Sequence, residues 1–309
     1  MALPDQNAKG TGVTHARPHF LHVGPEKTGT SWLYDMLAQH PQVRLNPVKE
    51  VRYLWESSAF PTEGVVARFR GRDWHNQDYR DYLRERLRYY SAHPARAVGS
   101  RGRLAWDLKF LFGRRSDDWF ASLFDCDAAS VTGDFSPQVS HLPPWDILRL
   151  SRAFPVTKIL LTLRDPVEWS WSFARMSMIQ GRDLAGVSES EFENFFAEYA
   201  TYYPGAGSLI TWRQLFGERF KLLFFEDIIA DPASVIADVC TFLGLSTDPI
   251  ASFEGLSDRS NAGRDLDLPD RVRRRLVDLH QDQMRLLAEL CGSRPREWLA
   301  RYGLEQRTV

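Results

Sequence analysis

Three short apolar runs along the chain are each followed by a polar turn and then by a helical pattern. The runs cover residues 19–23, 158–163 and 221–225, and the second is apolar at nearly every position. Continuous apolar runs of this length are typical of parallel strands that are buried on both faces. Because strand and helix patterns alternate, the sequence predicts an α/β fold with a central parallel sheet flanked by helices.

Apolar residues at helical spacing follow these runs, as expected where a helix succeeds each strand. They predict helices over residues 32–38 and 167–178. A third helix has an apolar face within residues 235–243 and is expected to end at Gly244, since glycine often ends helices. Residues 131–134 are interpreted as the end of a further strand. The segment after them is predicted to be a loop because it contains three prolines, Pro137, Pro143 and Pro144.

The chain shows no internal repeat and no low-complexity linker, so a single domain over residues 18–309 is the simplest interpretation. Residues 1–17 are polar and lack the apolar core of a signal peptide, which predicts a disordered tail. Residues 60–105 are rich in Arg, Tyr and Trp, and residues 78–90 have helical spacing. We interpret residues 60–105 as an insertion or a lid over the main sheet.

Charge and cysteine content limit the expected partners and compartment. The chain has 309 residues, with 39 basic and 40 acidic side chains. Proteins that bind nucleic acid usually carry a basic excess, so nucleic acid and long polyanionic substrates are disfavoured. The cysteines Cys126, Cys240 and Cys291 lie far apart, which indicates buried thiols in a reducing compartment. Since no apolar run approaches the length of a membrane span, we expect a cytoplasmic protein without a membrane partner.

A glycine-bearing loop between the first strand and its helix is the first chemical signal. Residues 24–31 read Gly-Pro-Glu-Lys-Thr-Gly-Thr-Ser. Backbone N–H groups of such a P-loop-like segment converge on an anion, and the N-terminus of the helix adds a positive end. A nucleotide triphosphatase loop places lysine directly before the hydroxyl that binds Mg²⁺, whereas Lys27 lies two residues before Gly29. An ATP-dependent P-loop kinase of a small metabolite is therefore the alternative interpretation.

A second polar segment follows the buried strand that ends at Leu163. Residues 164–172 read Arg-Asp-Pro-Val-Glu-Trp-Ser-Trp-Ser. An arginine at the carboxyl end of a strand can bind a phosphate through two parallel hydrogen bonds. Ser172 can add a hydroxyl in the crevice where doubly wound sheets bind ligands. This segment therefore has the residues of a second phosphate receptor.

Together these segments resemble the donor-binding motifs of sulfotransferases that use 3′-phosphoadenosine 5′-phosphosulfate (PAPS). The resemblance spans roughly residues 18–300, although only these two motifs are specific. It implies that Lys27 contacts the bridging oxygen of the phosphosulfate and that Arg164 and Ser172 bind the 3′-phosphate. Trp32 is either a nucleotide contact or a core aromatic residue, and Arg264 lies in a candidate loop over the 3′-phosphate. The implied donor-binding residues are Lys27, Thr28, Gly29, Thr30, Ser31, Trp32, Arg164, Ser172 and Arg264.

Two residues are candidates for the base that deprotonates the acceptor. Glu50 lies in Lys-Glu-Val-Arg-Tyr, which resembles the segment carrying the glutamate base of carbohydrate (heparan-type) sulfotransferases. His141 lies in Ser-His-Leu-Pro, which is similar to the segment carrying the histidine base of the cytosolic small-molecule branch. We prefer Glu50, and we expect Asp134 to orient neighbouring groups. Some heparan-type enzymes have a histidine where this chain has Arg52.

The resemblance implies a transferase that moves the sulfuryl group of PAPS to a hydroxyl or amine and releases 3′-phosphoadenosine 5′-phosphate (PAP). Lys27 is expected to neutralise the leaving phosphate. No metal is obligatory for this chemistry, and the sequence has no metal-ligand motif. A small molecule or saccharide is the expected acceptor, with aromatic stretches at residues 79–90 and 191–203 over the cleft. A nucleotide-binding protein without catalytic activity stays as a third interpretation, and the oligomeric state is left open.

Overall fold

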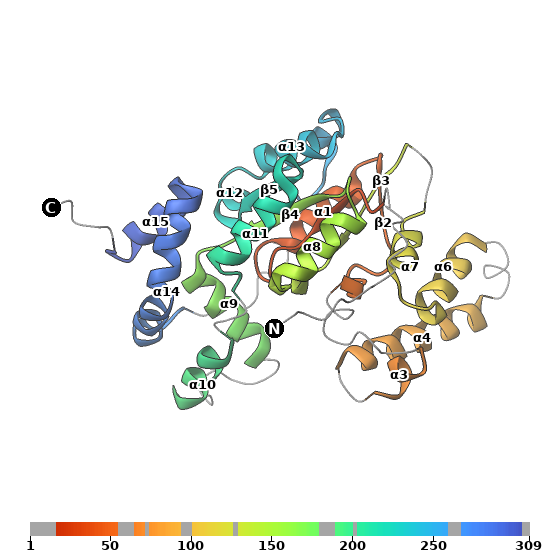
Figure 1. Ribbon diagram of the computed structural model, residues 1–309, viewed down its shortest axis with the longest axis horizontal. Helices are drawn as coiled ribbons and strands as arrows, with labels where there is room; N and C mark the ends of the chain where they lie inside the picture. The colour runs from red at the N-terminus through yellow and green to blue at the C-terminus, as the bar shows by residue number, and fades with distance from the viewer. Residues whose placement is uncertain are drawn as a thin grey trace, which may run out of the picture.

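A five-stranded parallel sheet lies at the centre of the computed structural model, with strand order β2-β3-β1-β4-β5 (Figure 1). The structure describes residues 17–54, 65–71, 74–93, 101–125, 129–178, 189–199, 203–258 and 267–304. The strands are β1 (Phe20–His22), β2 (Val43–Leu45), β3 (Val131–Phe135), β4 (Lys158–Leu163) and β5 (Phe220–Phe224). The predicted α/β fold with a parallel sheet is thus confirmed.

The sheet places the two predicted phosphate receptors on neighbouring strands. Strand β1 pairs in parallel with β3 on one side and with β4 on the other, so that Leu21 is opposite both Asp134 and Ile159. The carboxyl ends of β1 and β4 therefore meet at the same edge of the sheet. Strands β3 and β4 lie on opposite sides of β1, so the strand order reverses at β1. In open α/β sheets, ligands usually bind at the carboxyl ends of the strands at such a point.

Helices cover both faces of the sheet because successive strand residues point to opposite sides. Phe20 and Leu160 pack with apolar residues of α1 (Thr30–Gln39) and α13 (Pro232–Leu243). Leu21 and Leu161 pack on the other face with residues of α8 (Pro144–Ala153) and α11 (Ala206–Phe216). The remaining helices of this part are α9 (Pro166–Met178), α10 (Glu189–Tyr199), α12 (Phe225–Ala230), α14 (Asp270–Cys291) and α15 (Ser293–Arg301). Short 3₁₀ helices are η1 (Pro137–His141), η4 (Gly217–Arg219) and η5 (Asp248–Ser252).

The prediction of a loop after residues 131–134 is wrong. Pro137 is the first residue of η1, and Pro144 is the first residue of α8. The first helical position tolerates proline, because its missing N–H would have no partner within the helix and its φ already suits the helix. Elsewhere the helix predictions hold, and Gly244 ends α13 in the left-handed conformation with φ 81°.

The cysteine and membrane predictions are tested only in part. Cys240 is buried and Cys291 is half-buried, and both are free thiols, whereas Cys126 lies outside the described residues. Residues 1–16 of the predicted tail also lie outside them. No helix within the described ranges is long and apolar enough to span a membrane.

A block of helices lies on the β2 side of the sheet, lower right in Figure 1. It consists of α3 (Val65–Arg70), α4 (Trp74–Ala92), α6 (Arg101–Phe112) and α7 (Asp117–Ser122). Residues of α4 and α6 share a core with the segment after β2, including the ring pair Tyr79–Phe110 at 5.3 Å between centroids. Most of this block falls in the predicted insertion, and α4 contains the predicted helical stretch at residues 78–90.

The buried carboxylate of Asp107 holds α4 against α6. Asp107 is 2% exposed and accepts hydrogen bonds from the hydroxyls of Tyr82 at 2.6 Å and Tyr90 at 2.5 Å. It also pairs with Arg86 at 2.9 Å and Arg103 at 3.1 Å. Although burial opposes the change, these hydrogen bonds and charges lower the pKa of Asp107. The stabilisation is therefore present above the ordinary Asp pKa and is lost as the pH falls through the lowered value.

We expect Asp107→Ala to lower the free energy of unfolding by about 3 kcal/mol, because it removes the shared acceptor of two tyrosine hydroxyls and of the partly buried guanidinium of Arg86. Urea unfolding followed by far-UV circular dichroism measures the change. Asp81→Asn on the exposed face of α4 is the matched control and should unfold like the parent. Equal unfolding midpoints for Asp107→Ala and the parent would contradict this role.

Candidate active site

The loop after β1 is a tight turn fitted against β4. A side chain at Gly24 would place its Cβ 2.7 Å from the backbone nitrogen of Thr162, so only glycine fits there. Gly29 precedes α1 with φ 88°, and Lys27 also has a positive φ of 66°, which is uncommon for a residue other than glycine. The Thr28 hydroxyl donates to the carbonyl of Pro25 at 2.7 Å. Left-handed residues of this kind turn successive N–H groups toward one point, as in anion-binding loops.

Arg164 begins the segment after β4 and lies directly beside this loop. Its Nη1 donates to the backbone carbonyl of Lys27 at 3.1 Å, and its guanidinium lies 4.5 Å from the ring centroid of Phe225. The indole N–H of Trp169 on α9 donates to the carbonyl of Glu26 at 2.7 Å. The two predicted phosphate receptors are therefore hydrogen-bonded to each other.

Positive charge accumulates at this junction. Burial lowers the pKa of Lys27, and the nearby charges of Arg164 and Arg175 lower it further. Burial also lowers the pKa of Arg164, even though Glu168, Glu226 and Asp165 act in the opposite direction. Buried cations that disfavour one another are stabilised by a bound anion.

Arg175 was missed by the sequence predictions. It follows Ser172 by three residues on α9, a spacing that places two side chains on the same side of a helix. That spacing is the signal from which Arg175 could have been added to the second receptor.

The remaining predicted donor residues lie in different environments. Ser172 is 5% exposed on α9, and the neighbouring Ser170 is 2.7 Å from Nε2 of His280 and so belongs to the helix packing. Trp32 is 4% exposed in the core, where its indole N–H donates to the carbonyl of Leu256 at 3.0 Å. The structure thus places Trp32 in the protein core, the alternative role given for it above. Thr30 and Ser31 form the first turn of α1, and Arg264 lies outside the described residues.

Glu50 lies beside the phosphate loop, after β2. The amide of Gln138 on η1 donates both to Oε1 of Glu26 at 3.1 Å and to Oε2 of Glu50 at 3.4 Å. The neighbouring Lys49 donates from Nζ to the hydroxyl of Ser31 at 2.9 Å. Two independent contacts therefore join the Lys49-Glu50 segment to the loop and to α1.

Asp134 at the end of β3 fixes the backbone of the same segment. It is 1% exposed and accepts hydrogen bonds from the Ser136 hydroxyl and from the N–H of Val51 at 3.3 Å. Burial raises the pKa of Asp134 to about 7 against the effect of these hydrogen bonds, and the charge of Glu50 contributes to the rise. Asp134 thus holds the backbone of the residue that follows Glu50. That it orients neighbouring groups stays a prediction.

His141 is the last residue of η1, one turn after Gln138. Burial lowers the pKa of His141 to about 4, so that the imidazole is neutral near pH 7. A neutral imidazole can accept a proton, and a pKa of about 4 is as low as that of an ordinary carboxylate. The position favours Glu50 among the two candidates, because Glu50 lines the cavity described next and His141 is not among its lining residues.

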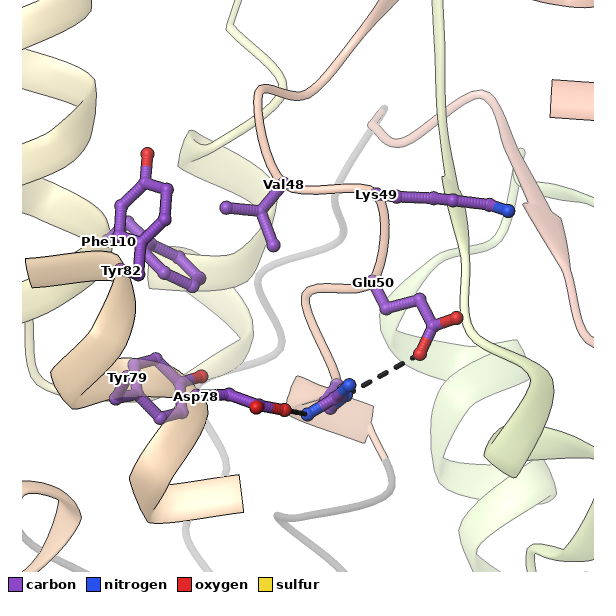
Figure 2. A pocket seen from close by; sticks show the side chains of 8 residues that line it. Val48, Lys49, Glu50, Asp78, Tyr79, Tyr82 and Phe110 are labelled. Atoms are coloured by element: carbon purple, nitrogen blue, oxygen red, sulfur yellow. Dashed lines mark hydrogen bonds and ion pairs between the residues drawn. The ribbon is translucent and has the colours of Figure 1, made fainter. Parts of the chain in front are cut away.

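A cavity of about 300 Å³ opens between the Glu50 segment and the helical block (Figure 2). One wall is formed by residues just after β2, and the other by side chains of α4 and α6. Arg52, with a positive φ of 59°, spans the two walls, because its guanidinium is 3.5 Å from Oε2 of Glu50 and is also paired with Asp78. The lining residues are Val48, Lys49, Glu50, Arg52, Asp78, Tyr79, Tyr82 and Phe110.

The fold and the site define an α/β protein with a P-loop-like anion receptor and a neighbouring cavity that contains a carboxylate. The model of the sulfotransferase family matches residues 18–249, and the chain belongs to this family. Within the described residues, no group of three or more His, Cys, Asp or Glu side chains could hold a metal ion.

Two comparisons with curated proteins and two with solved structures extend this result. The chain is 31% identical to carbohydrate sulfotransferase 15 of Rattus norvegicus and 30% identical to that of Homo sapiens, over 256 residues and 74% of this chain. It spans 44% of the length of these relatives. A sulfotransferase of Alicyclobacillus acidocaldarius superposes with a TM-score of 0.60 at 23% identity, over 92% of this chain and 99% of its own. The sulfotransferase domain of the Synechococcus PCC 7002 olefin synthase gives 0.56 at 18% identity, over 87% and 95%. At these identities the two structures show the shared fold.

Proposed function

We propose that the protein transfers the sulfuryl group of PAPS to a hydroxyl or amine of an acceptor and releases PAP. The observation that carries the proposal is the hydrogen bond between Arg164 and the Lys27 carbonyl. It brings two anion receptors together at one edge of the sheet, as a nucleotide with both a 5′- and a 3′-phosphate requires. A P-loop kinase needs no second receptor of this kind, and the family does not favour it.

The residues divide the binding of the donor between the two receptors. The N–H groups of residues 28–31 and the start of α1 bind the 5′-phosphate, and Lys27 lies at the bridging oxygen. Arg164 and Ser172 bind the 3′-phosphate, with Arg175 adding positive charge. Such fixed contacts favour transfer mainly by orienting the reactants and by stabilising charge on the leaving phosphate.

Transfer then follows an in-line path toward the cavity beside Glu50. The acceptor oxygen forms a bond to sulfur while the bond between sulfur and the bridging phosphate oxygen breaks. Glu50 takes the proton of the acceptor hydroxyl, and PAP leaves with the negative charge that Lys27 neutralises. The Gln138 amide and the Arg52 guanidinium hold the Glu50 carboxylate in place for this step. Because the curated relatives are named carbohydrate sulfotransferases, a saccharide hydroxyl is one candidate acceptor.

Calorimetric titration with PAP and with adenosine 5′-monophosphate tests the donor site. We expect Arg164→Ala to weaken PAP binding about 10- to 100-fold, the effect of losing a hydrogen bond to a charged group. Binding of the monophosphate should change little, since it has no 3′-phosphate. Ser172→Ala should weaken PAP binding in the same selective way, though less. Arg296→Ala on the exposed side of α15 is the control.

Two results would count against this assignment. An equal loss for both nucleotides would mean that Arg164 acts on the Lys27 loop and not on the 3′-phosphate. Tight binding of ATP–Mg²⁺ without any response to PAP would remove the sulfotransferase proposal itself.

A further inference from the structure

The charged groups of the cavity beside Glu50 already have partners within the protein. Arg52 is paired with Glu50 on one side and with Asp78 on the other (Figure 2). Lys49 extends away from Val48 in this view, and its ammonium binds the Ser31 hydroxyl and lies 5.3 Å from the ring centroid of Tyr34. The lining thus contains two cations and two carboxylates. Arg52 is ion-paired with both carboxylates, whereas Lys49 is held by the Ser31 hydroxyl.

The opposite wall of the cavity presents aromatic carbon. The Tyr82 hydroxyl donates to Asp107 at 2.6 Å, and the Tyr79 hydroxyl accepts from Arg115. Both hydroxyls are hydrogen-bonded to residues that do not line the cavity, so the two tyrosines present mainly ring carbon to it. Phe110 lies between them, stacked on Tyr79 at 5.3 Å and edge-on to Tyr82 at 5.4 Å between ring centroids. Val48, on the wall formed by the segment after β2, adds further apolar surface to the cavity.

We infer that the acceptor is a small uncharged alcohol or phenol with an apolar ring, and that an anionic saccharide is excluded. The inference rests on the proposed function, because Glu50 must face the acceptor. A sulfate or carboxylate against the aromatic wall would lie away from Lys49, which points to the other side of the segment (Figure 2). It would have to break the pairing of Arg52 or remain unpaired, and an unpaired charge that loses hydration is costly. The ring of a phenol can instead stack on the aromatic wall with its hydroxyl toward Glu50. A cavity of about 300 Å³ lies at the small end of ligand sites, which suits such a molecule.

Two acceptors that differ by one carboxylate test this inference. The probes are 2-naphthol and 6-hydroxy-2-naphthoate, and chondroitin sulfate serves as the polyanionic saccharide. PAP release in the presence of PAPS gives kcat/KM for each, and equilibrium binding of the two naphthols to the protein–PAP complex is followed by their fluorescence. We expect both kcat/KM and the binding affinity to be about tenfold or more higher for 2-naphthol than for 6-hydroxy-2-naphthoate. A preference for the carboxylated probe or for chondroitin sulfate would overturn the inference.

Asp78→Asn provides a sharper test, because it removes one of the two carboxylates that neutralise Arg52. We expect the carboxylated probe to bind this variant better than the parent. The ratio of kcat/KM for 2-naphthol to that for 6-hydroxy-2-naphthoate should therefore fall about fivefold or more. Asp81→Asn is the matched control, since Asp81 is also exposed on α4 but pairs with Arg84 outside the cavity. An unchanged preference in Asp78→Asn would show that the Arg52 pairing does not select the acceptor.

The outcomes separate this inference from the proposed function. PAP binding with transfer only to the anionic acceptors would keep the function and reject the acceptor class. If PAP does not bind, the proposed function is wrong. The preference of the cavity is then measured as the ratio of the affinities of the free protein for the two naphthols, with 2-naphthol again expected to bind about tenfold more tightly or better.

Discussion

Glu50→Gln is expected to lower kcat about 10²- to 10⁴-fold at saturating PAPS, the usual contribution of a positioned general base. The glutamine keeps the size of the side chain and a carbonyl oxygen that can accept the hydrogen bond from Gln138. It cannot accept the acceptor's proton. PAP affinity should stay close to that of the parent, because the contact between Glu50 and the donor loop is indirect, through Gln138. Steady-state kinetics and a calorimetric titration with PAP measure the two quantities.

His141→Ala gives the comparison that decides between the two candidate bases. Because His141 is not among the residues that line the cavity beside Glu50, its removal should reduce kcat much less than the glutamine substitution does. Near-parental turnover in Glu50→Gln would end the assignment of Glu50. A loss of several hundredfold confined to His141→Ala would identify the histidine as the base.

Strong local patterns made most of the sheet predictable. Strand β4 is buried at nearly every position, so its sequence is almost continuously apolar. Strand β2 was missed because it has only three residues and lies at the edge of the sheet, where Arg44 is exposed. Prolines in the sequence predict a loop where α8 lies, although proline suits the first position of a helix.

The site was predictable where a motif is local and unpredictable where side chains meet across the chain. The Lys27 loop and the Arg164 segment each have a readable spacing, and parallel topology then places them at one edge. Gln138 reaches Glu50 across 88 residues, and Arg52 reaches Asp78 across 26. No periodicity in the sequence encodes such contacts. The cytoplasmic location likewise stays a prediction from the sequence.

Lys27→Gln is expected to lower kcat about 10²- to 10³-fold, the typical loss when one group that stabilises a leaving anion is removed. Lys27 shares its surroundings with Arg164 and Arg175, and its pKa is lowered by burial and then by the charges of these two residues. In the protein without nucleotide this charge is therefore unfavourable. The same substitution should leave the melting temperature of the free protein unchanged or raise it.

The increase in melting temperature caused by PAP should shrink in this variant, because a ligand stabilises the folded state in proportion to the logarithm of its affinity. Thermal unfolding with and without PAP measures both effects, and Lys221→Gln, whose lysine pairs with Asp238, serves as the control. A variant less stable without PAP and equally stabilised by PAP would show that Lys27 is structural. We expect the opposite: a melting temperature that is unchanged or higher without PAP, and a smaller increase on adding PAP. This result would mean that the positive charge of Lys27 destabilises the free protein but stabilises the leaving phosphate. Such a compromise between stability and activity is common.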